Sequence, residues 1–252
     1  MRVIVTRPAA QAAAWVQALS QRGVDAVALP LITIAPPADP AAVAAVWRGL
    51  SAHRLVVFVS PSAAEQFFAR RPENIAWPTD VRAAAVGPGT AGVLVQHGVP
   101  AAALTQPRAD SPSFDSEALW QQLRMHDWQG APVLIVRGDG GRDWLADTLR
   151  AHGATVSFVA AYHRRPPHFD AAGLQLLDDA AERPDAHLWF FSSSEAIDHL
   201  AAARPAAGWS LSRAVATHPR IAERARVCGF GVVHESRPSV DSVVGCIQSI
   251  AS

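Results

Sequence analysis

Three short segments of this chain recur about 130 residues later, and they recur in the same order. The pairs are VIVTR at residues 3–7 with VLIVR at 133–137, VVFVSPSAAE at 56–65 with LWFFSSSEAI at 188–197, and AVGPGTA at 85–91 with ATHPRIA at 216–222. The separations of 130, 132 and 131 residues exceed the roughly 20–50 residues of solenoid repeats. The pattern therefore predicts two similar domains with a cleft between them, where small-molecule sites commonly lie.

The composition indicates a globular protein and excludes several kinds of chemistry. Of the 252 residues, 50% are hydrophobic and 17% are charged, which is enough apolar material for two domains of about 120 residues. The 22 basic residues balance the 22 acidic ones, so the charge gives no footprint for nucleic acid or an anionic membrane. Every basic residue is an arginine, which excludes Schiff-base, pyridoxal phosphate and P-loop lysines.

Neither a metal site nor a disulfide framework is expected. Cys228 and Cys246 are too few and too far apart for either, and the ten histidines show no ligand spacing. The N-terminal MRVIVTRP lacks the pattern of a signal peptide, and no uncharged apolar stretch approaches the roughly 18 residues of a membrane span. We therefore expect a cytoplasmic protein and, without a heptad pattern, a monomer.

Short apolar runs alternate with helical patterns, which is typical of βα units on a parallel sheet. The expected strands are residues 2–6, 24–30, 55–60, 83–86, 133–136, 155–164, 187–191, 213–217 and 231–236. Three of the intervening helices are predicted to end at Gly23, Gly98 and Gly153, because glycine commonly terminates helices. These patterns predict the α/β fold class with parallel sheets.

Two proline pairs mark the expected passages between the domains. Pro36-Pro37 and Pro166-Pro167 lie at matching points of the two copies, 130 residues apart. Periodicity alone leaves open whether the copies fold in tandem or exchange halves, because the segment 105–116 (TQPRADSPSFDS) is also linker-like.

One glycine-rich turn suggests a dinucleotide site. Residues 87–92 (GPGTAG) match G-x-G-x-x-G after an expected strand and before a helix. The motif does not close the first βα unit, however, and its repeat copy at 217–220 has lost every glycine. A tight turn with close helix packing is the favoured interpretation, and nucleotide-dependent catalysis is kept as an alternative.

Polar residues gather where expected strands meet helices. These junctions are Thr6-Arg7-Pro8, Ser60-Pro61-Ser62, Gly87-Pro88-Gly89-Thr90, Ser192-Ser193-Ser194 and the segment from Arg137 to Arg142. Serine and threonine at such positions are most often simple N-caps. Together, however, helix N-termini and the guanidinium groups of Arg7, Arg137 and Arg142 would form a surface for several carboxylates.

Tyr162 is the only tyrosine, and it ends an expected strand just before the second proline pair. Its phenol is able to donate a proton or a hydrogen bond to a leaving oxygen. The alternative is a tyrosine packed on the linker with its hydroxyl in water. Position alone does not separate the two.

In these motifs the chain resembles the uroporphyrinogen-III synthase family along essentially its whole length. The resemblance rests on VTRP (5–8), FVSPSA (58–63), AVGPGTA (85–91), VRGDGGRDWLADTL (136–149), Tyr162-His163-Arg164 and FFSSS (190–194). It implies two flavodoxin-like parallel-sheet lobes joined by a two-stranded linker, with a cleft between them. One lobe would comprise residues 1–35 plus 166–252, and the other residues 36–165.

The same resemblance implies a cofactor-independent lyase of haem biosynthesis. The family's substrate is hydroxymethylbilane, a linear tetrapyrrole with eight carboxylates. Its terminal hydroxyl is expelled, the last ring attacks at its substituted position to form a spiro intermediate, and the macrocycle closes with that ring inverted. We also expect a transient handover of the substrate from hydroxymethylbilane synthase, and no metal, nucleic-acid or membrane partner.

Residue by residue, the resemblance assigns assistance of hydroxyl departure to Tyr162. The expected substrate-binding residues are Arg7, Ser60, Ser62, Gly87, Thr90, Arg137, Gly138, Arg142, Ser193 and Ser194. Ile221 stands where many relatives have a substrate-contacting threonine, so that contact is not carried over. A catalytically silent sensor that closes on a tetrapyrrole or another polyanion is the alternative from a different class.

Overall fold

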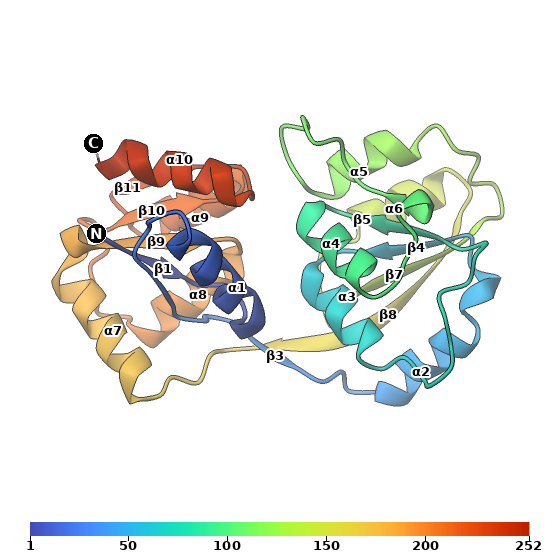
Figure 1. Ribbon diagram of the computed structural model, residues 1–252, viewed down its shortest axis with the longest axis horizontal. Helices are drawn as coiled ribbons and strands as arrows, with labels where there is room; N and C mark the ends of the chain where they lie inside the picture. The colour runs from blue at the N-terminus through green and yellow to red at the C-terminus, as the bar shows by residue number, and fades with distance from the viewer. Residues whose placement is uncertain (252) are drawn as a thin grey trace. The chain divides into compact units, whose positions relative to one another are not determined.

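The computed structural model describes residues 1–251, which form two compact units. Unit 1 comprises Met1–Thr33 together with the chain from Arg165 onward, and unit 2 comprises Ile34–Arg164. The chain passes into unit 2 within strand β3 (Thr33–Ala35) and returns within strand β8 (Thr155–Arg165), and these two strands are neighbours in one sheet. Both ends of the chain therefore belong to unit 1 (Figure 1).

Unit 1 contains a five-stranded parallel sheet with the order β2-β1-β9-β10-β11. Its strands are β1 (Arg2–Val5), β2 (Ala26–Ala28), β9 (His187–Phe191), β10 (Arg213–Ala216) and β11 (Val232–Glu235). Its helices are α1 (Ala9–Ser20), α7 (Ala171–Glu182), η3 (Pro184–Ala186), α8 (Ser194–Ala203), α9 (Pro219–Val227) and α10 (Val240–Ala251).

Unit 2 contains a six-stranded sheet with the order β3-β8-β7-β4-β5-β6, in which the pairs from β8 to β6 are parallel. Besides β3 and β8, its strands are β4 (Leu55–Phe58), β5 (Arg82–Ala85), β6 (Leu104–Thr105) and β7 (Pro132–Gly138). Its helices are α2 (Pro40–Arg48), η1 (Leu50–Ala52), α3 (Pro61–Phe68), α4 (Pro88–Gln96), η2 (Ala101–Ala103), α5 (Ser116–Leu123) and α6 (Trp144–Ala151). The predicted α/β fold class, with two sheets of mainly parallel strands, is confirmed.

Apart from the additional strand β3 in unit 2, the two sheets have the same topology, and the recurring segments occupy equivalent strands. The order β2-β1-β9-β10-β11 in unit 1 corresponds to β8-β7-β4-β5-β6 in unit 2. The three repeated pairs lie on β1 and β7, on β9 and β4, and on β10 and β5. Each sheet therefore combines the beginning of one copy with the end of the other, so the copies exchange halves. The linker-like segment 105–116 lies wholly inside unit 2.

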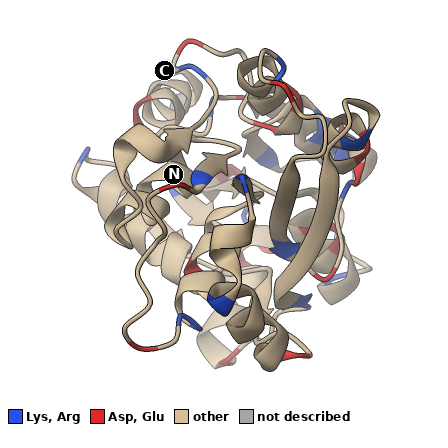
Figure 2. Cartoon of the chain, turned by 90° about the vertical axis from the view of Figure 1, so that its right-hand side faces the viewer, with Lys and Arg blue, Asp and Glu red and all other residues tan. Residues whose placement is uncertain are grey.

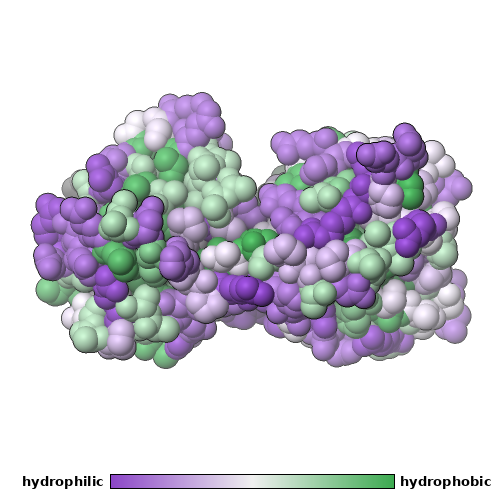
Figure 3. Space-filling view, turned by 90° about the horizontal axis from the view of Figure 1, so that it is seen from below, coloured by the Kyte–Doolittle hydropathy of each residue, from purple (hydrophilic) through white to green (hydrophobic). Residues whose placement is uncertain are grey.

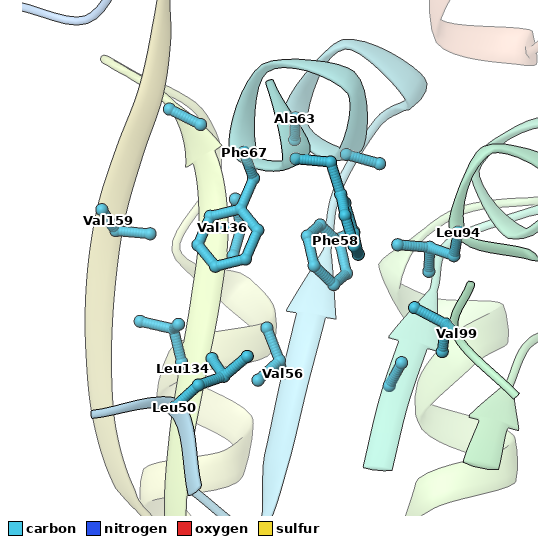
Figure 4. Packing of buried hydrophobic residues seen from close by; sticks show 14 of the residues in the cluster. Leu50, Val56, Phe58, Ala63, Phe67, Leu94, Val99, Leu134, Val136 and Val159 are labelled. Atoms are coloured by element: carbon cyan, nitrogen blue, oxygen red, sulfur yellow. The ribbon is translucent and has the colours of Figure 1, made fainter. Parts of the chain in front are cut away.

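The sheet of unit 2 is buried on both faces, as its near-continuous apolar strands predict. Along β4, Val56 and Phe58 face one helix layer, while Leu55 and Val57 face the other. Figure 4 shows the first layer, in which Phe67 from α3 packs against Phe58. Helices α2, α3 and α4 supply this layer, and α5 and α6 supply the opposite one. This packing fixes both β4 and α3, and therefore the junction between them.

The sheet of unit 1 is covered in the same way. Helices α1 and α10 pack on the face that carries Val3, Val5 and Phe190. On the adjacent positions of β9, the Trp189 and Phe191 rings are stacked, with centroids 5.9 Å apart and ring planes at 5°. Burial of such large side chains contributes roughly 1.5–3 kcal/mol each, so the strand ends are held on a rigid core.

The surface carries charges of both signs. Figure 2 shows arginines and acidic residues interspersed along helices and loops, and Figure 3 shows hydrophilic and hydrophobic residues mixed over each unit. Within residues 1–251, no helix is long and apolar enough to cross a membrane. The same residues contain no group of three or more His, Cys, Asp or Glu side chains suited to hold a metal ion.

Candidate functional site

Each sheet has one point where the strand order reverses. It lies between β1 and β9 in unit 1, and between β7 and β4 in unit 2. Ligands of open α/β sheets bind beyond the carboxyl ends of the strands at such a switch point. Arg7 follows β1 and Ser193 follows β9, while Gly138 ends β7 and Ser60 follows β4. The polar junctions of the sequence therefore include both switch points, which periodicity alone could not locate.

Tyr162 lies at the switch point of unit 2 with its hydroxyl paired inside the protein. The residue is only 4% exposed, and its Oη atom is 3.2 Å from Ser60 Oγ. Ser60 is the N-cap of α3, and its Oγ accepts a hydrogen bond from the Ala63 N–H at 3.0 Å. The Tyr162 ring lies against Gly138, where an added Cβ would come within 3.1 Å of the ring Cζ. The fold thus brings Tyr162, Ser60 and Gly138 together.

The two arginines of the predicted site in unit 2 are already ion-paired. Arg137 Nη1 donates to Asp143 at 2.5 Å, and its guanidinium lies 4.1 Å from the centroid of the Phe158 ring. Arg142 makes a bidentate pair with Glu117, at 2.5 and 2.9 Å. The hydrogen bonds to Glu117 raise the pKa of Arg142. A substrate carboxylate would therefore have to displace an acidic side chain from either arginine.

Arg7 in unit 1 has a different environment. Its guanidinium lies over Trp15 at 4.8 Å and over Phe190 at 5.8 Å from the ring centroids, and within residues 1–251 no carboxylate pairs with it. The Nε atom is buried without a hydrogen-bond partner. This desolvation lowers the pKa of Arg7 to about 10, so the side chain is still charged at neutral pH. A partly buried cation without a counter-ion is costly and favours an anionic ligand.

The two helices that flank Arg7 also begin without side-chain caps. Neither Pro8 at the start of α1 nor Ser193 at the start of α8 makes a side-chain cap hydrogen bond. The first backbone N–H groups of such helices attract anions, because they lack intrahelical partners and lie at the positive end of the helix dipole. The simple N-cap interpretation therefore holds for Ser60 but not for Ser193.

The glycine-rich turn packs against Phe114. Gly87 is the N-cap of α4, and a Cβ added to it would lie 2.9 Å from Phe114 Cβ. Thr90 and Ser62 are both buried, at 2% and 4% exposed. The glycine at position 87 thus serves close packing with Phe114. This packing disfavours the dinucleotide alternative, which needs a backbone open to a pyrophosphate.

The second turn is capped by a histidine. His218 is the N-cap of α9, and its Nδ1 accepts the Arg220 N–H at 3.1 Å. Ile221 is 8% exposed and contributes to the core. The residue that replaces the expected threonine is therefore a packing residue.

The sequence does not predict a hydrogen bond between two side chains beside Tyr162. His163 Nδ1 is 2.7 Å from Asp139 Oδ2, and the Asp139 N–H donates to the Tyr162 carbonyl at 3.1 Å. The hydrogen bond from His163 is the largest cause that lowers the pKa of Asp139. Both residues lie in the quoted motifs, but they are 24 positions apart in the sequence, so no local pattern indicates the contact.

Comparison with known proteins gives a consistent assignment. The family model described as uroporphyrinogen-III synthase HemD matches residues 13–245. The chain belongs to the uroporphyrinogen-III synthase family. It is 33% identical over 173 residues to the uroporphyrinogen-III synthase of Salmonella typhimurium, covering 68% of each chain. It is 31% identical over 175 residues to that of Escherichia coli, again covering 68% of each chain.

Solved structures of uroporphyrinogen III synthases share the fold. A mutant enzyme from the extremely thermophilic bacterium Thermus thermophilus aligns with a TM-score of 0.60 and 15% identity, covering 100% of this chain and 99% of that one. The enzyme from Helicobacter pylori aligns with a TM-score of 0.55 and 17% identity, covering 99% and 100%. At these identities the likeness concerns the fold alone.

Proposed function

We propose that this protein catalyses the reaction of its family, the closure of hydroxymethylbilane to uroporphyrinogen III with inversion of the last ring. Membership of the uroporphyrinogen-III synthase family over residues 13–245 supports this activity. The observation that carries the mechanism is the buried phenol of Tyr162, held 3.2 Å from Ser60 at the switch point of unit 2.

In the first step Tyr162 assists the departure of the terminal hydroxyl. The C–O bond breaks, the phenol supplies a proton to the leaving oxygen, and water departs. The carbocation that remains is stabilised by the pyrrole nitrogen. The last ring then attacks through its substituted carbon, giving the spiro intermediate, which reopens and closes through the unsubstituted carbon of that ring. That carbon loses one proton as aromaticity returns, which restores the proton that the phenol gave up.

The reaction requires no electron acceptor, because one water leaves and one carbon–carbon bond forms without net oxidation. We therefore propose that the enzyme works without a cofactor. Its main task is to hold a reactive cation in the conformation that leads to the inverted product, since uncatalysed closure gives the other isomer. Positioning of this kind contributes a large part of many rate enhancements.

Binding of the carboxylates falls to backbone N–H groups, hydroxyls and arginines at the strand ends. Arg7 is the strongest of these, because its charge has no carboxylate partner in the described chain. We propose the same substrate-binding set as the sequence does, namely Arg7, Ser60, Ser62, Gly87, Thr90, Arg137, Gly138, Arg142, Ser193 and Ser194. Within it, Arg137 and Arg142 contribute only by exchanging Asp143 and Glu117 for substrate carboxylates.

We further propose a cytoplasmic monomer that receives its unstable substrate from hydroxymethylbilane synthase. The interspersed charges and the zero formal net charge fit a protein that meets its small anionic substrate in solution.

A coupled assay tests the function. Porphobilinogen and hydroxymethylbilane synthase generate the substrate in situ, and the oxidised porphyrin isomers are separated by chromatography. We expect isomer III with the protein and isomer I without it. Isomer I in both reactions, from a folded protein that still binds the tetrapyrrole, would replace the enzyme by the catalytically silent sensor.

A further inference from the structure

We propose that Tyr162 is aimed and polarised by three positioning features, namely a β-bulge at Ala161, the missing side chain of Gly138 and the hydroxyl of Ser60. The inference rests on the proposed function, in which the phenol gives a proton to the leaving hydroxyl. It gives Ser60 and Gly138 a task in addition to the substrate binding proposed above, because both also act through the tyrosine.

The bulge determines which face of the sheet the phenol reaches. Arg137 of β7 is aligned with Ala160 of β8, but the next residue, Gly138, is aligned with Tyr162, so Ala161 is the extra residue. Bulges are rare in parallel sheets, and where they occur near active sites they redirect a side chain.

Strict alternation would place Tyr162 on the wrong face. Phe158 packs with the helix layer of α5 and α6, and every second residue after it would face the same way. Instead Tyr162 joins Val159 and Ala161 in the layer of α2, α3 and α4. Ser60 begins α3 in that layer, so the bulge is what brings the hydroxyl within reach of the cap.

Gly138 makes room for the ring. A Cβ at this position would lie 3.1 Å from Cζ, 3.2 Å from Cε2 and 3.4 Å from Oη of Tyr162. Contacts this short force the ring to move by a few tenths of an ångström, and the hydrogen bond to Ser60 would lengthen. The absence of a side chain at position 138 therefore sets the position of the phenol.

Ser60 determines the direction of the hydrogen bond. Its Oγ accepts the Ala63 N–H, which lies at the positive end of α3. This interaction withdraws electron density from Oγ, which makes the serine a better donor and a poorer acceptor. Ser60 therefore donates to Tyr162 Oη, and the phenol proton is left free for the substrate. A relay from the helix N-terminus through Ser60 makes the phenol a stronger proton donor.

A double-mutant cycle separates this role from a structural one. We expect Ser60→Ala to lower kcat roughly tenfold, because one hydrogen bond to the reacting group is lost. In a Tyr162→Phe background the same substitution should change kcat no further, since the group it acts on is gone. An equal reduction in both backgrounds would overturn the proposal.

Asp39→Ala is the matched control. Asp39 caps α2 in unit 2, and its carboxylate accepts the Ala42 N–H at 3.0 Å, so its removal costs a comparable cap without touching Tyr162. We expect unchanged kcat for this variant. A loss equal to that of Ser60→Ala would show that the serine matters only as a helix cap.

The single tyrosine allows a readout that does not depend on activity. In protein labelled with ¹³C at the tyrosine Cζ, NMR gives one resonance, which Ser60→Ala and Gly138→Ala should shift while Asp39→Ala leaves it in place. If both variants shift the resonance but the wild-type protein makes only isomer I, the proposed function is refuted and the positioning of Tyr162 stands. If neither variant shifts the resonance and the wild-type protein makes isomer III, the positioning alone is refuted.

Discussion

Arg7 differs from the other arginines of the predicted site in what surrounds its charge. Arg137 and Arg142 have acidic partners from their own unit, whereas Arg7 has two aromatic faces and a buried Nε without a partner. The sequence could place all three at strand ends, because the strand pattern is local. It could not tell them apart, because the Arg142 pair with Glu117 spans 25 residues and the neighbours of Arg7 include a strand 183 positions away.

Replacement of Arg7 should affect stability and binding in opposite ways. Arg7→Met keeps the packing on Trp15 and removes a desolvated charge, so the melting temperature should stay the same or rise. The KM for hydroxymethylbilane should rise roughly tenfold, because a charge-assisted contact is lost. Thermal melting and the coupled assay measure both quantities.

Arg54→Met is the control for this variant. Arg54 also lies over an aromatic ring, that of Trp128 at 5.6 Å, but it donates to the Asp127 carbonyl at the opposite ends of the strands. Its KM should be unchanged. A lower melting temperature with normal KM in Arg7→Met would contradict the assignment and make Arg7 a structural residue.

The Asp139–His163 pair gives a prediction for acid. The hydrogen bond from His163 lowers the pKa of Asp139 in the folded protein. The pair therefore stabilises the fold above the unfolded-state value near pH 4, and this contribution is lost as the pH falls through the lowered folded value. Because the Asp139 side chain is 43% exposed, the effect should be small, about 0.5 kcal/mol. Denaturant unfolding at several pH values should show that the free energy of unfolding falls less towards acid pH in His163→Ala than in the wild type. An equal dependence on pH in the two proteins would contradict this.

At the scale of elements, the sequence predicts the ends of helices correctly where the backbone conformation requires a glycine. Gly23, Gly98 and Gly153 have φ angles of +78°, +90° and +91°, which is the left-handed geometry that ends a helix, and α1, α4 and α6 end just before them. The sequence does not predict strand β6 or helix α5. They border the segment 105–116, whose prolines and serines indicated a linker, and burial of Leu119 and Leu123 overrides that signal.

The N-cap residues of α8 and α7 are expected to have different roles, one in substrate binding and the other in stability. Ser193 begins α8 without a side-chain hydrogen bond, so Ser193→Ala should leave the free energy of unfolding nearly unchanged. Asp170 caps α7 through the Gly173 N–H at 2.8 Å, and Asp170→Ala should cost about 1 kcal/mol. In the coupled assay only Ser193→Ala should raise KM. A destabilised Ser193→Ala variant with normal KM would show an ordinary cap.

At the scale of the whole chain, the repeat predicted duplication but not its arrangement. Equal separations arise whether the copies fold in tandem or exchange halves, and only the pairing of β1 with β9, and of β7 with β4, distinguishes the two. These pairings depend on contacts between the two copies, which no local pattern records. The exchange has a functional consequence, because each switch point is built from one strand of each copy.

Division of the chain between the copies should therefore leave neither half able to fold. Fragments 1–130 and 131–252 each contain strands of both sheets, yet neither contains a complete sheet. Circular dichroism should show little cooperative unfolding for either fragment alone, and a cooperative transition should return when the two are refolded together. Independent cooperative folding of both fragments would contradict the exchanged topology.

The central claim is that this protein directs the closure of a tetrapyrrole towards the inverted isomer. The most direct measurement is the fraction of isomer III formed as the enzyme concentration is raised, for the wild type beside Tyr162→Phe. The wild type should give almost entirely isomer III at amounts far below the substrate, and the variant should require roughly 10²-fold more protein for the same fraction. Isomer I as the main product at every concentration of folded wild-type protein would contradict the account.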